Sequence, residues 1–283
     1  MGEHDSPPFW RRRLGKVLRE LRESARISPS EACTRLDFSP ARLSRMESGQ
    51  TAPEPVVLKA MLDVYGVPAS DWTWYLDLGR EARKKGWWQA YGLSAMGYVA
   101  LEEAASSVRD FGLAYIPGLL QTEDYVRAVL RDSPARFTKV RFENEVDVRL
   151  IRQRRLVSDA DALDLTAFVD EGALRRPVGG PQVMRTQLHW LVARAELPNV
   201  TLRVVPTAVG QHAGMMSAFT VLSFPSLQDP DIAYVEHAAG SVFLEKADEV
   251  RACTLRFDRL DALALPVDES VELIERIAAE GST

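Results

Sequence analysis

An arginine flanked by small side chains gives residues 39–48 a face that could form hydrogen bonds with another molecule. Ser39 followed by Pro40 is a helix start signal and Gly49 is a stop signal, so we expect a helix over about 40–48. The apolar side of this helix is narrow. Opposite it, at 100° steps, lie four small or polar residues: Ala41, Ser44, Arg45 and Ser48.

The side chains on this face suit different contacts with double-stranded DNA. Arg45 can donate two hydrogen bonds to guanine O6 and N7, and Ala41 can contact a thymine methyl group. Ser44 lies beside them, where a small residue lets the backbone approach the bases closely. Arg42 lies on the flank, so we assign it, with Ser39, to phosphate contacts. The pattern predicts a recognition helix in the major groove.

Glu47 lies on the core side of the same helix, close in angle to Leu43. A lone buried carboxylate is costly, so Glu47 needs a partner. Arg22, one turn beyond Leu18 on the preceding amphipathic helix, is the candidate. We expect a partly buried ion pair between Arg22 and Glu47 that ties the first helix to the third.

Arg11, Arg12 and Arg13 stand where the first helix is expected to begin. Positive charge at that end opposes the helix dipole. Either DNA phosphate compensates these charges or the helix start is frayed and solvated. We assign the three arginines to phosphate contacts.

A compact helical module is needed to position these residues. Apolar spacing, start signals and stop signals predict four helices, at about 12–24, 29–36, 40–48 and 55–66. The short gap between the second and third helices is typical of a helix-turn-helix.

The distribution of charge supports a nucleic-acid partner. Residues 11–45 hold ten basic and four acidic residues, a net charge of +6, whereas residues 67–283 hold 24 basic and 31 acidic, a net charge of −7. A basic module joined to an acidic body indicates nucleic acid at one end and a different partner at the other.

Residues 14–67 resemble the Xre-type (Cro/repressor-like) helix-turn-helix domain, and the segment LSRMESG at 43–49 is the most specific part of the resemblance. The resemblance implies transcriptional regulation through sequence-specific binding to double-stranded DNA, usually as a homodimer. It also supports the pair between Arg22 and Glu47, which recurs in that family.

The sequence departs from the family pattern at two helix starts. Ser28 and Pro29 stand where the family usually has Thr-Gln or a similar pair, whose glutamine touches the DNA backbone. Pro40 and Ala41 stand where the family often has residues that hydrogen-bond to bases. Base reading by hydrogen bonds would then rest on Ser44, Arg45 and, in addition, Arg42, with Arg45 carrying most of it.

Four segments are expected: a flexible N-terminus at 1–10, the DNA-binding domain at 11–67, a helical tryptophan-rich connector at 68–88, and a regulatory or partner-binding domain at 89–283. The connector contains Trp72, Trp74, Trp87 and Trp88. These tryptophans either pack between the two domains, which we favour, or form an exposed patch for a partner.

The larger domain is expected to be α+β with a mostly antiparallel sheet. Helices are expected near 97–109, 122–131, 138–157, 181–197, 247–263 and 268–280. Short β-branched or aromatic runs predict strands at 163–170, 200–206, 218–224, 231–237 and 241–246.

Residues that could carry catalysis are scattered. His189, His212 and His237 lack metal-ligand spacing, and Glu236 would point away from the face of its neighbour His237. The sequence has no G-x-S-x-G, Walker-type or G-x-G-x-x-G motif. We therefore expect no metal, no cofactor and no enzymatic activity.

The cysteines and the N-terminus favour a cytoplasmic protein. Cys33 and Cys253 lie far apart without ligand spacing, which is typical of reduced, buried thiols. The first residues, MGEHDSPPFWRRR, have no apolar run behind them, so neither a signal peptide nor a membrane-spanning helix is expected.

Several separated segments resemble a C-terminal domain of unknown function found behind Xre-type modules in GC-rich bacteria that form filaments and spores. They lie at 115–130, 170–180, 196–206, 210–215 and 219–225. The resemblance implies a small acidic partner protein and a role in development or antibiotic production. An alternative is an antitoxin-like protein that sequesters a small partner and autoregulates through DNA binding.

Overall fold

The computed structural model describes residues 7–93, 97–132, 137–160, 162–224, 230–237 and 240–280. The chain divides into two compact units, Met1–Ala104 and Ala105–Thr283. Of the N-terminus expected to be flexible, residues 1–6 lie outside the described part, and residues 7–10 are helical.

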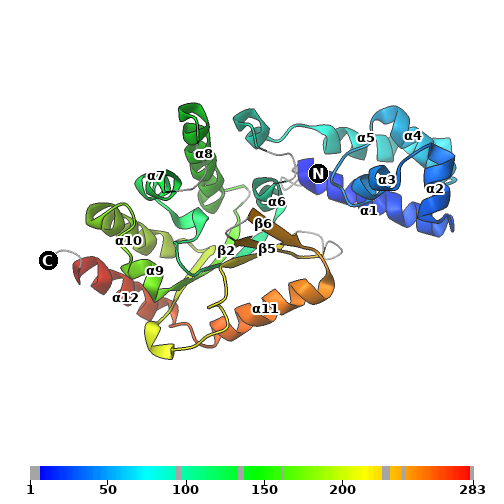
Figure 1. Cartoon of the computed structure of the whole chain (residues 1–283). Helices are drawn as coiled ribbons and strands as arrows, with labels where there is room; N and C mark the ends of the chain where they lie inside the picture. Colours follow the sequence, from blue (N-terminus) through cyan, green and yellow to red (C-terminus); the bar gives the residue numbers. More distant parts are fainter. Residues whose placement is uncertain are drawn as a thin grey trace. The chain divides into compact units, whose positions relative to one another are not determined.

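The first unit is helical throughout its described elements, drawn from blue to cyan-green in Figure 1. Its α-helices are α1 (Pro7–Ser24), α2 (Pro29–Leu36), α3 (Pro40–Glu47), α4 (Pro55–Val64), α5 (Trp72–Arg83) and α6 (Tyr98–Ala104). Three predicted helices therefore start where expected. Among the described residues, no helix has the length and apolar character needed to cross a bilayer.

The starts of α2 and α3 are fixed by the same local chemistry. The Ser28 hydroxyl accepts a hydrogen bond from the Glu31 backbone N–H at 3.2 Å, and the Ser39 hydroxyl accepts one from the Arg42 N–H at 3.3 Å. Each serine is followed by a proline at the first helical position. Such caps satisfy donors that the helix itself leaves unpaired, so the start of α3 is encoded locally.

Helix α1 begins at Pro7, one and a half turns before the predicted start near Arg12. Proline is tolerated in the first helical turn, and the buried rings of Phe9 and Trp10 extend the apolar side toward the N-terminus. The arginines at 11–13 therefore lie beyond the first turn, where the helix dipole no longer opposes their charge. The predicted helix start was wrong in this respect.

The tryptophans of residues 68–88 occupy different environments. Trp72 Nε1 donates to the Val67 carbonyl at 2.9 Å, Trp74 is 50% exposed, and Trp88 is fully buried. Helix α5, which carries the first two, packs against α1 within the first unit. A 3-10 turn at Ala69–Asp71 precedes α5, and Asp71, at the N-cap position, makes no capping hydrogen bond with its side chain.

The second unit is built on one six-stranded sheet with the order β3-β2-β1-β4-β5-β6. The strands are β1 (Ser107–Gly112), β2 (Asp164–Asp170), β3 (Val200–Val205), β4 (Phe219–Ser223), β5 (Ile232–His237) and β6 (Gly240–Leu244). The α-helices are α7 (Glu123–Arg131), α8 (Lys139–Arg152), α9 (Glu171–Arg175), α10 (Pro181–Ala195), α11 (Ala247–Asp261) and α12 (Val267–Glu280).

The sheet is mixed, and most of its pairings are antiparallel. Strand β1 pairs in parallel with β2, and β2 in parallel with β3. The pairs β1–β4, β4–β5 and β5–β6 are antiparallel. The predicted fold class, a helical domain followed by an α+β domain with a mostly antiparallel sheet, is confirmed.

The central strand β1 was missed by sequence reasoning, which extended a helix over 97–109. The helix α6 ends at Ala104, and β1 begins at Ser107. Val108 and Phe111 of this strand are fully buried, and β2 and β4 pair with both of its edges. Its sequence, SVRDFG, contains little periodic signal, so tertiary pairing decides its conformation.

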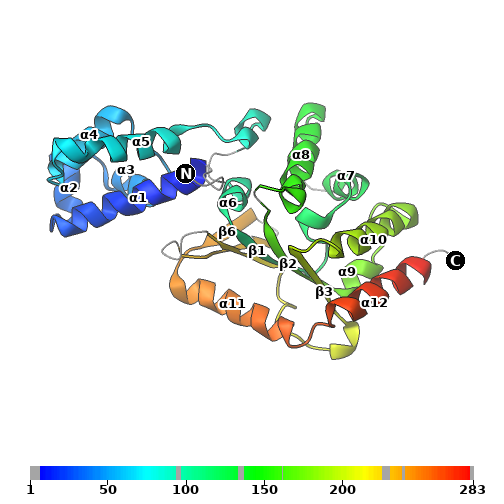
Figure 2. The same ribbon diagram turned by 180° about the vertical axis from the view of Figure 1, so that it is seen from behind.

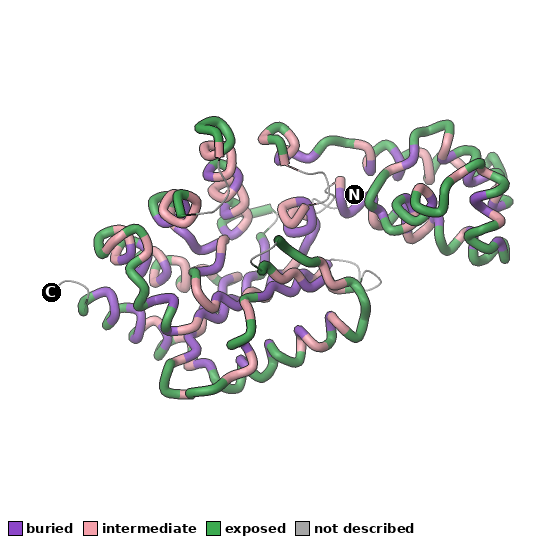
Figure 3. Tube along the Cα trace, in the orientation of Figure 1, coloured by how far each residue is buried: buried purple, intermediate pink, exposed green. Residues whose placement is uncertain are grey.

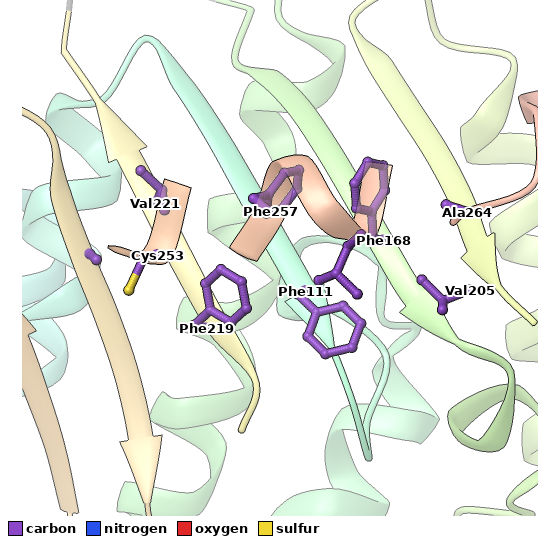
Figure 4. Close-up of a cluster of buried hydrophobic side chains, with 10 residues drawn as sticks. Phe111, Phe168, Val205, Phe219, Val221, Cys253, Phe257 and Ala264 are labelled. Atoms are coloured by element: carbon purple, nitrogen blue, oxygen red, sulfur yellow. The ribbon is translucent and has the colours of Figure 1, made fainter. Parts of the chain in front are cut away.

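Helix α11 covers one face of the sheet, and α7, α8 and α10 lie on the other side (Figures 1 and 2). Under α11 the core is rich in aromatic rings (Figure 4). Phe257 of α11 stacks on Phe168 of β2 with ring centroids 4.5 Å apart and meets Phe219 of β4 edge-on at 6.2 Å. Burial of these rings holds α11 against the sheet.

Candidate nucleic-acid interface

Helix α3 buries one side and exposes the other as the sequence predicts. Leu43 and Met46 are 2% and 7% exposed. On the opposite side, four residues are exposed: Ala41, Ser44, Arg45 and Ser48. Within the described part of the chain, the guanidinium of Arg45 makes no hydrogen bond or ion pair, so its donors are available to another molecule.

An ion pair between Arg22 and Glu47 fixes the orientation of α3. Arg22 Nε and Nη2 donate to the two carboxylate oxygens of Glu47 at 2.7 and 2.9 Å, and Nη1 donates to the Ile27 carbonyl at 3.0 Å. The hydrogen bond with Glu47 raises the pKa of Arg22. The side chains of Arg22 and Glu47 are 6% and 11% exposed, so this bidentate pair joins α1 to α3 away from bulk water, and the bond to Ile27 holds the turn before α2.

Two glycines let the backbones of α1 and α3 approach closely. A Cβ on Gly15 would lie 2.6 Å from the Met46 carbonyl oxygen, and a Cβ on Gly49 would lie 2.6 Å from the Arg12 Cα. Gly49 also has φ +72°, which suits glycine at a helix end. Sequence reasoning identified Gly49 as a stop signal but missed Gly15.

A groove of about 860 Å³ runs beside α3 and is bordered by α1 and α2. Its polar lining includes Arg19 of α1, Ser30 and Thr34 of α2, Ser44 of α3, and Ser48 directly after α3. Sequence reasoning did not single out Arg19, although it lies three residues before Arg22 on the same helix. The rest of the lining is largely apolar, with Phe38 and Leu43 among it, and also includes the carboxylate of Asp37. The exposed side of α3 thus borders a groove of mixed polar and apolar character.

Arg42 and Ser39 lie at the start of α3, on the flank of its exposed side. The Arg42 guanidinium carbon lies 4.1 Å from the centre of the Phe38 ring, a cation–π contact that holds the side chain in place. Ser39 is exposed and accepts the cap hydrogen bond, which leaves its own O–H as a donor. Their contact with phosphate stays a prediction.

The three arginines at 11–13 point in different directions, and one assignment must be corrected. Arg11 is 6% exposed and its Nε donates to the Ala82 carbonyl at 2.9 Å; burial lowers its pKa. A phosphate cannot reach this side chain, so Arg11 is a structural link to α5. Arg12 is half-buried, whereas Arg13 is exposed and lies over Trp10 and Trp74, 5.4 and 6.0 Å from their ring centres.

In the second unit, His212 is the histidine closest to a catalytic arrangement. Its Nε2 lies 3.1 Å from Asp170 Oδ2, and its Nδ1 accepts a hydrogen bond from the Gly214 N–H at 3.2 Å. Because Nδ1 is the acceptor, Nε2 carries the proton that is donated to Asp170. Both ring nitrogens are therefore occupied, and His212 fastens its loop to the end of β2.

The other residues considered for chemistry do not assemble into a site. His189 and His237 are exposed on separate elements, α10 and β5. No group of three or more potential metal ligands occurs within the ranges that the structure describes. Gly179 and Gly180 have φ +74° and +95° and form the turn into α10.

Two family models match the chain. One, described as a helix-turn-helix domain, matches residues 13–72, and the other, described as a domain of unknown function (DUF5753), matches residues 96–276. No curated protein and no solved structure matches. The helix-turn-helix match covers the exposed α3, the Arg22–Glu47 pair and the adjoining groove, and it suggests a DNA-binding regulator.

Proposed function

Since the chain belongs to the DUF5753 family and carries a helix-turn-helix domain ahead of that domain, we propose that it is a sequence-specific transcriptional regulator of the Xre type. The observation that carries the proposal is the exposed side of α3. There an arginine without an internal partner stands among small residues, on a helix held rigidly by a buried ion pair. In this role α3 enters the major groove and Arg45 reads a base.

The second unit is proposed to act by binding, as a receptor for a partner protein or a ligand, rather than by catalysis. Two of its buried polar side chains, Gln187 and His212, support this view, because their hydrogen bonds hold loops in place. Gln187, for example, accepts from the Thr122 N–H at 2.6 Å and donates to the Leu120 carbonyl at 2.7 Å. His212 is engaged at both nitrogens in the same way.

The test compares two arginines of α3 on DNA. A preferred site is first selected from random duplexes with the full chain, and affinity is then measured at fixed salt on that site and on random DNA. We expect Arg45→Ala to lose about 1 to 3 kcal/mol on the selected site, roughly 5- to 150-fold, and to relax one base position. Arg42→Ala should weaken both DNAs similarly.

Arg80→Ala is the matched control, because Arg80 is an exposed arginine on α5 that pairs with Asp77. Arg80→Ala should change neither the affinity for the selected site nor the affinity for random DNA. Equal losses from Arg45→Ala on selected and random DNA would exclude base reading by Arg45, and the absence of any preferred site would exclude sequence-specific binding.

A further inference from the structure

The two edge strands of the sheet in the second unit, β3 and β6, differ in whether their outward-facing backbone groups are hydrogen-bonded. At the β3 edge, the Val204 N–H donates to the Ser270 hydroxyl at 3.0 Å, and the Leu265 N–H donates to the Val204 carbonyl at 2.9 Å. Arg203 of the same strand donates to the Leu265 carbonyl at 2.8 Å. The segment between α11 and α12, together with the first turn of α12, thus lies along this edge and satisfies the backbone groups of Val204.

The β6 edge is open. Among the described residues, no strand, loop or side chain pairs with the side of β6 that faces away from β5. The first part of β6, residues 240–242, is exposed, and Val242 is 42% exposed. Figure 3 shows exposed segments in green. In an antiparallel pair, every second residue directs its N–H and C=O away from the neighbouring strand, so β6 presents unpaired backbone groups.

The apolar layer beneath α11 continues to this edge. Val242 lies opposite Val235, and Leu244 lies opposite Ala233, so these four side chains share one face of the sheet. Ala233 is part of the aromatic core under α11, and Val235 and Leu244 pack against it. Val242 extends this apolar face to the edge strand, and among the described residues no strand pairs with the outer side of β6.

Open edges in soluble proteins are usually protected by a charge, a proline or a bulge, and β6 has neither charge nor proline in its sequence GSVFL. We propose that β6 pairs with β6 of a second copy of this chain, antiparallel, around a two-fold axis at Val242. The two sheets then form one continuous sheet across the dimer.

The sequence of β6 is complementary to itself in this register. With Val242 opposite its copy, Gly240 lies opposite Leu244 of the partner subunit, and Ser241 lies opposite Phe243 of the partner subunit. A small side chain therefore meets a large one on each face of the shared sheet. No like charges meet across the axis, which is the usual obstacle to self-pairing.

Substituting Val242 with a positive or a negative residue tests whether two copies of β6 pair around Val242. In the full chain, Val242→Lys and Val242→Glu each place like charges on the axis, so both variants should sediment as monomers where the unchanged protein is a dimer. An equimolar mixture should restore a dimer that contains one copy of each, which native mass spectrometry identifies. A monomeric unchanged protein, or variants that remain dimeric, would overturn the proposal.

A cysteine provides a second test with a milder substitution. Directly opposed residues of an antiparallel pair have Cα atoms about 4.5 to 5.5 Å apart, within disulfide range. Val242→Cys should therefore form a disulfide between subunits on oxidation. Leu255→Cys is the control, since Leu255 is 50% exposed on α11, and it should not cross-link. Cross-linking of both variants, or of neither, would contradict the proposed pairing.

DNA binding separates this proposal from the proposed function. Folded monomeric variants should keep the base preference of Arg45 and lose affinity for sites with two repeated half-sites, because each copy then binds alone. If the charged Val242 variants become monomers as expected but the unchanged protein selects no DNA site, the proposed function is refuted and the proposed pairing of β6 is supported. If the unchanged protein selects a DNA site but does not pair through β6, the proposed pairing is refuted and the proposed function is supported.

Discussion

The two units use polar side chains in opposite ways. In the first unit, α3 directs Arg45 and its small neighbours outward, and the buried Arg22–Glu47 pair serves to hold that surface still. In the second unit, the buried polar side chains described above, Gln187 and His212, turn inward and satisfy loop backbones. Unengaged donors on a rigid element mark a surface for another molecule, whereas engaged ones mark internal structure.

The largest effect is expected from breaking the pair that holds α3. Glu47→Ala leaves the Arg22 guanidinium charged and buried without its carboxylate, which should cost about 3 to 5 kcal/mol of unfolding free energy. Urea denaturation followed by circular dichroism measures this loss. DNA affinity should fall as well, because α3 is no longer oriented.

Arg19→Ala is the matched control on the same helix. It removes an exposed pair, in which Arg19 Nε and Glu23 Oε1 are 2.9 Å apart, and should cost less than about 1 kcal/mol. Similar losses of stability from Glu47→Ala and Arg19→Ala would show that the buried pair does not hold the first unit together.

In the second unit, we expect a substitution that lowers stability without changing DNA affinity. Gln187→Leu removes the acceptor of the Thr122 N–H and the donor to the Leu120 carbonyl. Unsatisfied buried backbone groups should destabilise the unit by about 2 to 4 kcal/mol. DNA affinity at low temperature should stay unchanged, since the interface lies in the other unit.

Gln182→Leu serves as its control, because Gln182 is exposed on the same helix α10. It should leave the denaturation midpoint nearly unchanged. If Gln187→Leu kept full stability but lost DNA binding, Gln187 would act in DNA binding rather than in holding the loops of the second unit. This result would contradict the difference between the two units.

A smaller effect should follow from Gly15→Ala. The added methyl group would lie 2.6 Å from the Met46 carbonyl oxygen, which is backbone and cannot rotate away, so α1 and α3 must separate. We expect a loss of about 1 to 3 kcal/mol and weaker DNA binding. Thermal unfolding and affinity on the selected site measure both.

Gly79→Ala places the same methyl group in α5, 2.7 Å from Leu58 Cδ2, the end of a flexible side chain. This variant should be less costly, because Leu58 can change rotamer. If Gly79→Ala were the more damaging of the two, the close approach of α1 and α3 would not be what sets the position of the recognition surface.

The first unit was more predictable than the second because its signals are local. Ser39, Pro40 and Gly49 mark the ends of α3 within one short segment, and a helix exposes its faces in a fixed angular order. The start of α1 was misplaced because Pro7 was not read as a start signal, as Pro29 and Pro40 were, and because the burial of Phe9 and Trp10 depends on tertiary packing. Arg11 was misassigned for the same reason.

The sequence by itself determined the helix boundaries around α3 and the division of its faces, because caps and angular spacing act within a few residues. The partner of Glu47, 25 residues away, was inferred from the cost of a lone buried carboxylate and from the family resemblance. Only the tertiary structure decided that Arg11 is buried, that β1 is a strand at the centre of the sheet, and that β6 is left at an open edge. Strand pairing and burial depend on residues far apart in the chain, and the free energy that selects them comes from contacts that no short segment contains.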